Sequence, residues 1–230
     1  YYSSNQLDYL DTICIMKRIG FSLGEIKAHM KSYTIDDSIV ALRKQLSIID
    51  RQIKELQMIK KRVENRCLQM EHSVSIRDCS DIVSVEEVSS RYILLQEVAA
   101  PYTLEMLSIA TKECFARAFR EQLPVFFQSG AIVPYERILQ GRYTEASFAF
   151  LPIEKADNIG GIVELPKGRS VFTYHIGDYH SIYRAYERIL EHCRINRLTI
   201  ASDSYEFAIN DYLSTSKESE YITKIMFYIE

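Results

Sequence analysis

The stretch DDSIVALRKQLSIIDRQIKELQMIKKRVENRCLQM, residues 36–70, decides the fold of this chain. Its apolar side chains recur at alternating steps of four and three residues, and one step falls on Lys60 instead. The apolar positions are Leu42, Leu46, Ile49, Ile53, Leu56, Val63, Cys67 and Met70. This spacing marks the a and d positions of a coiled coil and predicts a helix of roughly 50 Å that buries a narrow seam against a partner helix. We therefore expect residues 36–75 to form the axis of a homodimer.

The length and composition of the chain indicate what kind of protein contains this helix. The chain has 230 residues, of which 47% are hydrophobic and 26% charged, and its net charge is −3. This length suggests two small domains, and no apolar run approaches the roughly 18 residues that a membrane span needs. The five cysteines are scattered and form no CxxC motif, which is typical of thiols in a reducing cytoplasm. We expect a cytoplasmic protein without a membrane partner.

Two short helices are predicted before the long one. Ser3-x-x-Gln6 and Ser22-x-x-Glu25 are capping boxes, which mark helix starts, and Gly20 is a natural end for the first helix. Two helices of about fifteen and ten residues cannot enclose a core alone. Residues 1–35 are therefore expected to be the C-terminal part of a larger domain.

Residues 1–30, YYSSNQLDYLDTICIMKRIGFSLGEIKAHM, followed by the long helix, resemble the end of the DNA-binding domain of MerR-family transcription regulators. In that family a winged helix-turn-helix ends in a Tyr-Tyr strand, and two helices and a long antiparallel dimerisation helix follow. The resemblance implies that the helix-turn-helix and most of the wing would lie before Tyr1, and that promoter DNA and RNA polymerase are partners. It makes Tyr1, Tyr2 and Ser3 candidates for phosphate contacts, which position a protein without reading bases. The alternative is that Tyr2 only closes a hydrophobic staple with Leu7.

Some MerR-family regulators sense metals or redox state through clustered cysteine thiolates. Here Cys67 falls in the apolar seam, and Cys79 stands twelve residues further on without a companion. Soft-metal and redox clusters need several converging or closely spaced cysteines. We therefore expect neither a metal site nor a cofactor.

Beyond the seam, residues 76–89 are interpreted as a linker and residues 90–230 as a β-rich domain. Strand runs and amphipathic helices follow one another in a β-α-β-β order that occurs twice. The expected strands are 92–98, 130–134, 146–152, 170–176, 204–210 and 221–229, and the expected helices are 103–122 and 179–196. The whole chain is thus expected to be α+β, with a pseudo-twofold C-terminal domain and a cleft between the sheets of its two halves.

Residues 165–230 resemble the GyrI-like effector-binding domain. The motifs that carry the resemblance are the Pro166-Lys-Gly turn, the Gly177-Asp-Tyr turn, the Ala185-Tyr186 helix and the Ser204-Tyr-Glu strand. Together with the MerR-type head, this tail is similar to that of multidrug-responsive MerR activators. In that subgroup amphipathic cations bind among aromatic side chains around a central glutamate, which the strand motif places at Glu206.

The chemistry of Glu206 agrees with this resemblance. Alternation along strand 204–210 places Glu206 on one face, among small neighbours, and three larger residues on the other. The larger residues, which we expect to pack on the helices, are Tyr205, Phe207 and Ile209. A carboxylate that points into a weakly polar cleft is costly unless a charge pairs with it, and a lipophilic cation can supply that charge. The alternative is an ion pair with Lys224 on the neighbouring strand. Further candidate ligand-binding residues are Tyr221, Tyr143, Phe148, Tyr174 and Pro101.

The sequence thus predicts a ligand-responsive transcription activator that binds promoter DNA as a dimer and senses lipophilic cations. One alternative is a GyrI-like hydrolase that uses Glu206 as a general base. Another is a stand-alone protein-binding module of the gyrase-inhibitor kind, which the long helix disfavours. No serine–histidine or cysteine–histidine pair stands near the cleft motifs, so the activator is preferred and no enzyme activity is expected.

Overall fold

A computed structural model describes residues 4–31, 34–76, 81–121, 123, 128–153, 160–212 and 214–230. The chain divides into two compact units, residues 1–63 and 64–230. The candidate DNA contacts Tyr1, Tyr2 and Ser3 lie outside the described residues, so that assignment stays a prediction. No helix among the described residues combines the length and the apolar character required to cross a bilayer.

The first unit holds α1 (Ser4–Arg18) and α2 (Leu23–His29) ahead of the long helix. The predicted capping box at Ser22 is confirmed: its Oγ accepts from the Glu25 N–H, and the Glu25 carboxylate accepts from the Ser22 N–H at 2.9 Å. Between the two helices Gly20 adopts φ +101°, a conformation that favours glycine. The small buried core of this unit consists of Met16, Phe21 and Ile26.

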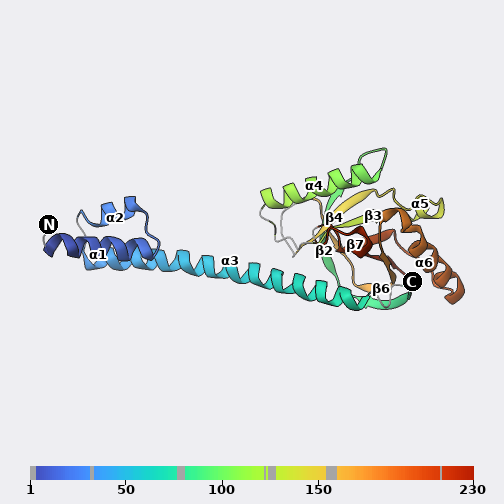
Figure 1. The fold of residues 1–230 in the computed structure, drawn as a ribbon, viewed down its shortest axis with the longest axis horizontal. Helices are drawn as coiled ribbons and strands as arrows, with labels where there is room; N and C mark the ends of the chain where they lie inside the picture. The colour runs from blue at the N-terminus through green and yellow to red at the C-terminus, as the bar shows by residue number, and fades with distance from the viewer. Residues whose placement is uncertain are drawn as a thin grey trace. The chain divides into compact units, whose positions relative to one another are not determined.

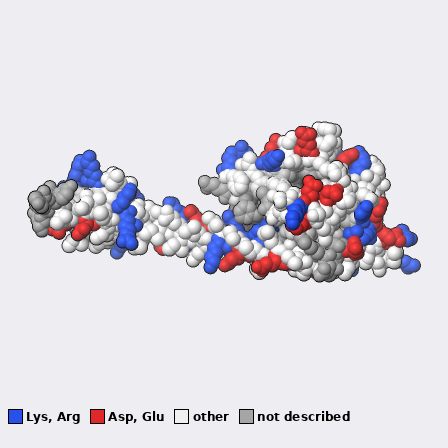
Figure 2. Space-filling model, viewed as in Figure 1, with Lys and Arg blue, Asp and Glu red and all other residues white. Residues whose placement is uncertain are grey.

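The predicted long helix is confirmed as α3 (Ile35–Ile76), which has 42 residues. Of the eight seam residues, Ile49 is half-buried and the other seven are exposed in the single chain, with Leu56 64% exposed. In Figure 2 much of the visible surface of α3 carries neither acidic nor basic side chains. A stripe of apolar side chains of this length favours a second helix as its cover, so the homodimer remains our expectation.

The second unit is built on one eight-stranded antiparallel sheet (Figure 1). Its strands are β1 (Ser84–Val88), β2 (Arg91–Glu97), β3 (Gly130–Val133), β4 (Phe148–Ile153), β5 (Ile162–Leu165), β6 (Gly168–Ile176), β7 (Ser204–Asn210) and β8 (Ile222–Tyr228). They lie in the order β1-β6-β8-β7-β3-β4-β2-β5. The helices are α4 (Leu104–Arg120), α5 (Tyr135–Leu139) and α6 (Tyr183–Asn196), with short 3-10 helices η2 (Tyr179–Ser181) and η3 (Glu218–Glu220).

The predicted pseudo-twofold order is confirmed, since β2-α4-β3-β4 is repeated as β6-α6-β7-β8. The predicted cleft between two separate sheets is wrong, because β3 pairs with β7 from Gly130↔Phe207 to Val133↔Ser204. This pairing satisfies the backbone groups of two strands that would otherwise be exposed edges. Any binding site at the junction of the halves therefore lies on a face of one continuous sheet.

The two faces of β7 have surroundings opposite to those predicted. Glu206 pairs in register with Ala131, which belongs to the core beneath α6, so Glu206 is on the helix-covered face. Tyr205, Phe207 and Ile209, which we expected against the helices, lie in the core on the opposite face, to which the end of α3 contributes. Alternation separates the two faces of a strand but cannot tell which one the helices cover.

Candidate functional site

Glu206 lies at the centre of β7 and is only 1% exposed. Its Oε2 accepts a hydrogen bond from the Tyr179 hydroxyl, and its Oε1 accepts one from the Tyr186 hydroxyl. The Tyr186 hydroxyl also lies 3.0 Å from Ser204 Oγ. Among the residues that the structure describes, no lysine, arginine or histidine forms an ion pair with this carboxylate. Hydrogen bonds therefore hold Glu206 without a compensating charge.

Local sequence signals position the two tyrosines. The Asp178 carboxylate caps η2 by accepting from the N–H groups of His180 at 2.8 Å and Ser181 at 3.1 Å, which fixes the turn that carries Tyr179. Tyr186 follows on α6 and is fully buried. Tyr179 on η2 and Tyr186 on α6 thus direct their hydroxyls toward the same carboxylate.

The environment of Glu206 changes its acidity. Burial raises the pKa of Glu206 from 4.5 to about 7, and the hydrogen bonds from Tyr179 and Tyr186 oppose that rise. Burial, together with the neighbouring carboxylate, raises the pKa of both tyrosines well above the ordinary value, so both hydroxyls stay protonated donors. Glu206 therefore titrates near neutral pH, and a cation placed beside it would favour its ionised form.

The alternative that Lys224 pairs with Glu206 is wrong. The Lys224 ammonium forms an ion pair with Glu86 of β1 and lies 4.0 Å from the centroid of the Phe172 ring. Lys224 is opposite Phe207 in the pairing of β7 with β8. Its side chain therefore lies on the sheet face that Glu206 does not share.

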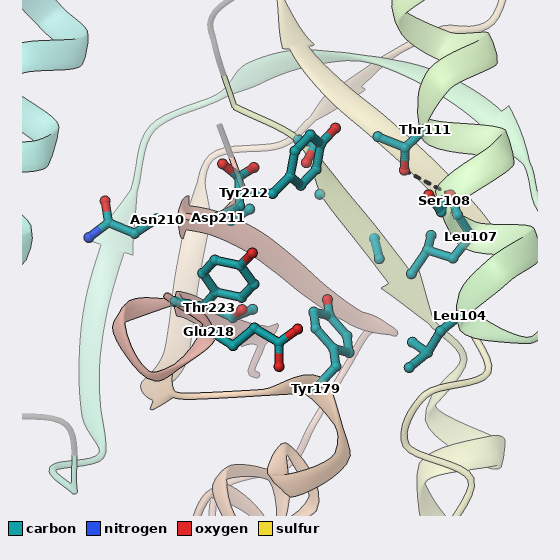
Figure 3. Close-up of a pocket in the computed structure, with 15 residues that line it drawn as sticks. Leu104, Leu107, Ser108, Thr111, Tyr179, Asn210, Asp211, Tyr212, Glu218 and Thr223 are labelled. Carbon is teal, nitrogen blue, oxygen red and sulfur yellow. Dashed lines mark hydrogen bonds between the residues drawn. The ribbon is translucent and has the colours of Figure 1, made fainter. Parts of the chain in front are cut away.

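A cavity of about 440 Å³ lies on the helix-covered face, beside α4 and the end of β7 (Figure 3). Small residues of the central strands form part of its floor, namely Gly130, Ala131 and Ala208. A Cβ at Gly130 would lie 2.1 Å from the Phe150 ring and 2.5 Å from the Glu206 carbonyl oxygen, so this position admits glycine alone. On the cavity side, the small side chains of Ala131 and Ala208 leave room for an aromatic ring to lie against the sheet.

The walls of the cavity are aromatic and acidic. Its three tyrosines are Tyr179, Tyr212 and Tyr221, and its two carboxylates belong to Asp211 and Glu218. In Figure 3 the Glu218 carboxylate points toward Tyr179. No lysine or arginine is among the described residues that line the cavity. Ring faces attract cations, and tyrosine joins an apolar body to a polar tip, so this lining suits a cationic guest that carries aromatic rings.

Glu206 itself is not among the residues that line this cavity, which corrects the expectation that it points directly into an open cleft. Tyr179 lines the cavity and also donates its hydroxyl to Glu206. A guest would therefore meet Tyr179 first, and the tyrosine hydroxyl connects the cavity to the buried carboxylate.

The structure brings together some of the predicted ligand-binding residues and not others. Tyr221 lines the cavity. Tyr143 does not line the cavity and stacks on Tyr186 with ring centroids 5.4 Å apart. Phe148 and Tyr174 pack in the core on the opposite face of the sheet, and Pro101 is exposed ahead of the α4 cap. Only Tyr221 and Glu206, through Tyr179, are joined to the cavity, and the ligand role of each residue stays a prediction.

Several residues of the site were missed by the sequence argument. Tyr179 and Tyr186 both fall within motifs that carry the GyrI-like resemblance, and their spacing alone would have placed them on one helical face. Tyr212 and Glu218 lie between β7 and β8 in a stretch without periodicity. No sequence pattern indicated that this stretch lines the cavity.

Two family models match the chain: "MerR, DNA binding" over residues 7–65 and "GyrI-like small molecule binding domain" over residues 83–230. The chain is also similar to the multidrug-efflux transporter 2 regulator of Bacillus subtilis (strain 168). The two are 25% identical over 232 residues, which cover 100% of this chain and 83% of the relative.

Solved structures share the fold. The cryo-EM structure of the EcmrR–DNA complex in EcmrR-RPo has a TM-score of 0.53 and 16% identity, and the match covers 100% of this chain and 85% of that one. The crystal structure of the EcmrR C-terminal domain has a TM-score of 0.54 and 14% identity, and covers 65% of this chain and 97% of that one. The GyrI-like match alone spans more than half of the sequence, and the MerR match precedes it. The chain therefore belongs to the MerR-type transcription regulators that carry a GyrI-like small-molecule-binding domain.

Proposed function

We propose that this chain is a transcription activator whose output is controlled by lipophilic, cationic small molecules bound in the cavity beside Tyr179 and Glu206. The observation that carries the ligand class is a fully buried carboxylate, linked by a tyrosine hydroxyl to a tyrosine-lined cavity, for which the described part of the chain supplies no counter-charge. A bound cation would supply the missing charge, and each ring face would add about 0.5–2 kcal/mol of cation–π attraction. The similarity to a regulator of a multidrug-efflux transporter supports a drug-like small molecule as the effector.

The DNA side of the proposal rests on residues 7–65, which match the MerR DNA-binding model. EcmrR is seen with DNA in the complex EcmrR-RPo, which supports promoter DNA and RNA polymerase as partners of this chain. The long exposed seam of α3 supports action as a dimer, and binding to promoter DNA agrees with a cytoplasmic location. An activator of this kind can work by changing promoter shape, because DNA deformation has a free-energy cost that a protein conformation can offset.

Binding without catalysis is part of the proposal. A pKa of about 7 would suit a general base, but both carboxylate oxygens of Glu206 already accept hydrogen bonds from tyrosines. Incubation of the protein with an activated ester of a lipophilic acid, followed by mass spectrometry, should return the ester unchanged beyond the buffer rate. Enzyme-dependent hydrolysis that Glu206→Gln abolishes would replace this part of the proposal with the hydrolase alternative.

The ligand class is tested by fluorescence or calorimetric titration with tetraphenylphosphonium and, in parallel, with neutral triphenylmethanol. We expect Glu206→Gln to weaken binding of the cation by about tenfold, the effect of one lost charged contact, and to leave the neutral compound unaffected. The matched control is Glu187→Gln, which removes the same charge from an exposed position of α6. Equal affinities of wild type and Glu206→Gln for the cation would remove Glu206 from the proposed role.

A further inference from the structure

One segment of the second unit both lines the cavity and is held by α3. This exit segment comprises residues 209–214 at the end of β7, of which residue 213 lies outside the described part of the chain. Asn210, Asp211 and Tyr212 line the cavity. In Figure 3 Asp211 and Tyr212 stand at its edge, and the amide of Asn210 points away from it. The exit segment is therefore a wall of the binding site with a second, outward-facing side.

On its outward side the exit segment is bound by Arg66 of α3. Arg66 Nη1 donates to the Ile209 carbonyl oxygen at 3.0 Å, and Nη2 donates to Ser214 Oγ at 2.5 Å. Nη2 also lies 3.9 Å from Asp211 Oδ1. One guanidinium thus contacts the beginning, the middle and the end of the segment, which suits the fixed fork of an arginine side chain.

Ser73 of α3 makes a second contact with the exit segment, at Asn210. Asn210 Nδ2 donates to Ser73 Oγ at 2.8 Å, and Ser73 Oγ donates to the Met70 carbonyl oxygen at 2.6 Å. Ser73 is 3% exposed. The outward amide of Asn210 is therefore fixed to the backbone of α3 through a buried hydroxyl.

The contacts of Arg66 are shielded from water. The side chains of Arg66 and Asp211 are each 12% exposed, whereas a free surface pair is open to solvent and contributes little. Burial lowers the pKa of Arg66, and Asp211 opposes that effect. Removing one partner of a shielded charged group leaves the other without compensation, so the position of the exit segment depends on Arg66.

We propose that Arg66, assisted by Ser73, is a positioning residue that sets one wall of the effector cavity and couples occupancy of the cavity to α3. Coupling requires contacts that differ between the free and the bound protein. A guest that packs on Asp211 touches a residue that Arg66 of α3 contacts, and Tyr212 follows Asp211 directly in the chain. Because α3 is one helix from Ile35 to Ile76, Arg66 belongs to the same element as the coiled-coil seam. The identity of the guest rests on the proposed function, but the positioning role of Arg66 does not.

The positioning role is tested without ligand, by hydrogen exchange of the backbone amides of the full chain. The Ser214 and Thr215 N–H groups donate to the Asp211 carbonyl oxygen at 2.8 and 3.1 Å, so their exchange reports on the exit segment. We expect Arg66→Gln to accelerate their exchange by about tenfold. Arg66→Lys should accelerate it almost as much, because a single ammonium group cannot make the several hydrogen bonds of the guanidinium. The control Lys61→Gln removes a positive charge from an exposed position of the same helix and should leave exchange unchanged. Equal exchange in Arg66→Gln and Lys61→Gln would overturn the positioning role.

The coupling is tested by repeating the measurement with saturating tetraphenylphosphonium. In wild type we expect the cation to slow exchange at residues 214–215 and also within α3 near Arg66. In Arg66→Gln we expect the protection of α3 to disappear, and affinity for the cation to fall by about fivefold. Full protection of α3 in Arg66→Gln would overturn the coupling.

Two milder variants serve if Arg66→Gln does not fold. Ser214→Ala and Ser73→Ala each remove one contact of the exit segment with α3, and each should show the same effects at smaller size. Absence of any effect in both would overturn the inference. If wild type binds no lipophilic cation at all, the proposed function fails, and the ligand-free exchange experiment still decides the role of Arg66.

Discussion

At the scale of single residues, the burial of Glu206 has a cost that depends on pH. The pKa of this carboxyl is about 7 in the folded protein and 4.5 as an ordinary group. Between these values the folded protein holds a proton that the unfolded chain has lost, so stability falls as pH rises from 4.5 to 7 and remains lower above 7. The full effect corresponds to about 3 kcal/mol. Glu206→Gln cannot ionise and lacks this penalty.

We therefore predict that Glu206→Gln gains stability relative to wild type as pH rises. The difference in the free energy of unfolding should be larger at about pH 8 than at about pH 5, by as much as 3 kcal/mol. Urea unfolding of both proteins at the two pH values measures it, and Glu187→Gln should show no such change. A difference that is the same at both pH values would mean that Glu206 does not titrate in this range.

The hydroxyl of Tyr179 makes a second prediction at this scale. Its hydrogen bond to Glu206 lowers the pKa of the carboxyl against the effect of burial. Tyr179→Phe keeps the ring in the cavity wall and removes that hydrogen bond, so the pKa of Glu206 should rise further. The pH midpoint above which tetraphenylphosphonium binds tightly should shift upward. Tyr212→Phe, which changes another tyrosine of the cavity, should leave the midpoint unchanged, and equal midpoints in all three proteins would contradict the role of Tyr179.

Those parts of the site that depend on neighbouring residues in the sequence could be predicted, and those that depend on contacts between distant elements could not. Glu206 was found because a strand motif and alternation are properties of neighbouring residues. Its hydrogen bonds with Tyr179 and Tyr186 depend on how η2 and α6 lie over β7, which no local pattern encodes. The pairing of Lys224 was mispredicted for the same reason. The strands of Glu206 and Lys224 are neighbours, as predicted, but their register places Lys224 opposite Phe207, on the other face of the sheet.

At the scale of elements, α3 was predictable because its apolar pattern extends over about eight helical turns and contains no proline or glycine. The strands β1 and β5 and the helix α5 were missed. They have 5, 4 and 5 residues, too few for a periodicity to stand out from chance. β1 and β5 are also the outermost strands of the sheet, where pairing with one neighbour allows a mixed sequence such as SVEEV.

The exposed seam of α3 supports a prediction about assembly. Leu56→Lys places a charge at a seam position that is 64% exposed in the single chain, and a charge there opposes burial against a second helix. We expect the variant to be a monomer by light scattering at concentrations where wild type is a dimer. Met58→Lys makes a comparable change at a position off the seam that is 48% exposed, and it should remain a dimer. Dimerisation of Leu56→Lys with unchanged affinity would show that the seam is not the interface.

At the scale of the whole molecule, all the elements of the site lie in the second unit, residues 64–230. The contacts of the exit segment with Arg66 and Ser73 lie there too, at the end of α3. A fragment of residues 64–230 should therefore bind tetraphenylphosphonium as tightly as the full chain. A fragment that begins at residue 81 keeps every residue that lines the cavity but loses the support of α3, together with the part of the core that Ile76 fills.

We predict that the shorter fragment binds the cation more weakly by about tenfold, since the wall formed by Asp211 and Tyr212 loses the contacts that hold it. Calorimetric titration of the two fragments measures the difference, and circular dichroism melting checks that both are folded. A folded shorter fragment with the affinity of the longer one would show that the cavity is complete without α3. In that case the ligand signal would have to reach the seam by a route other than the exit segment.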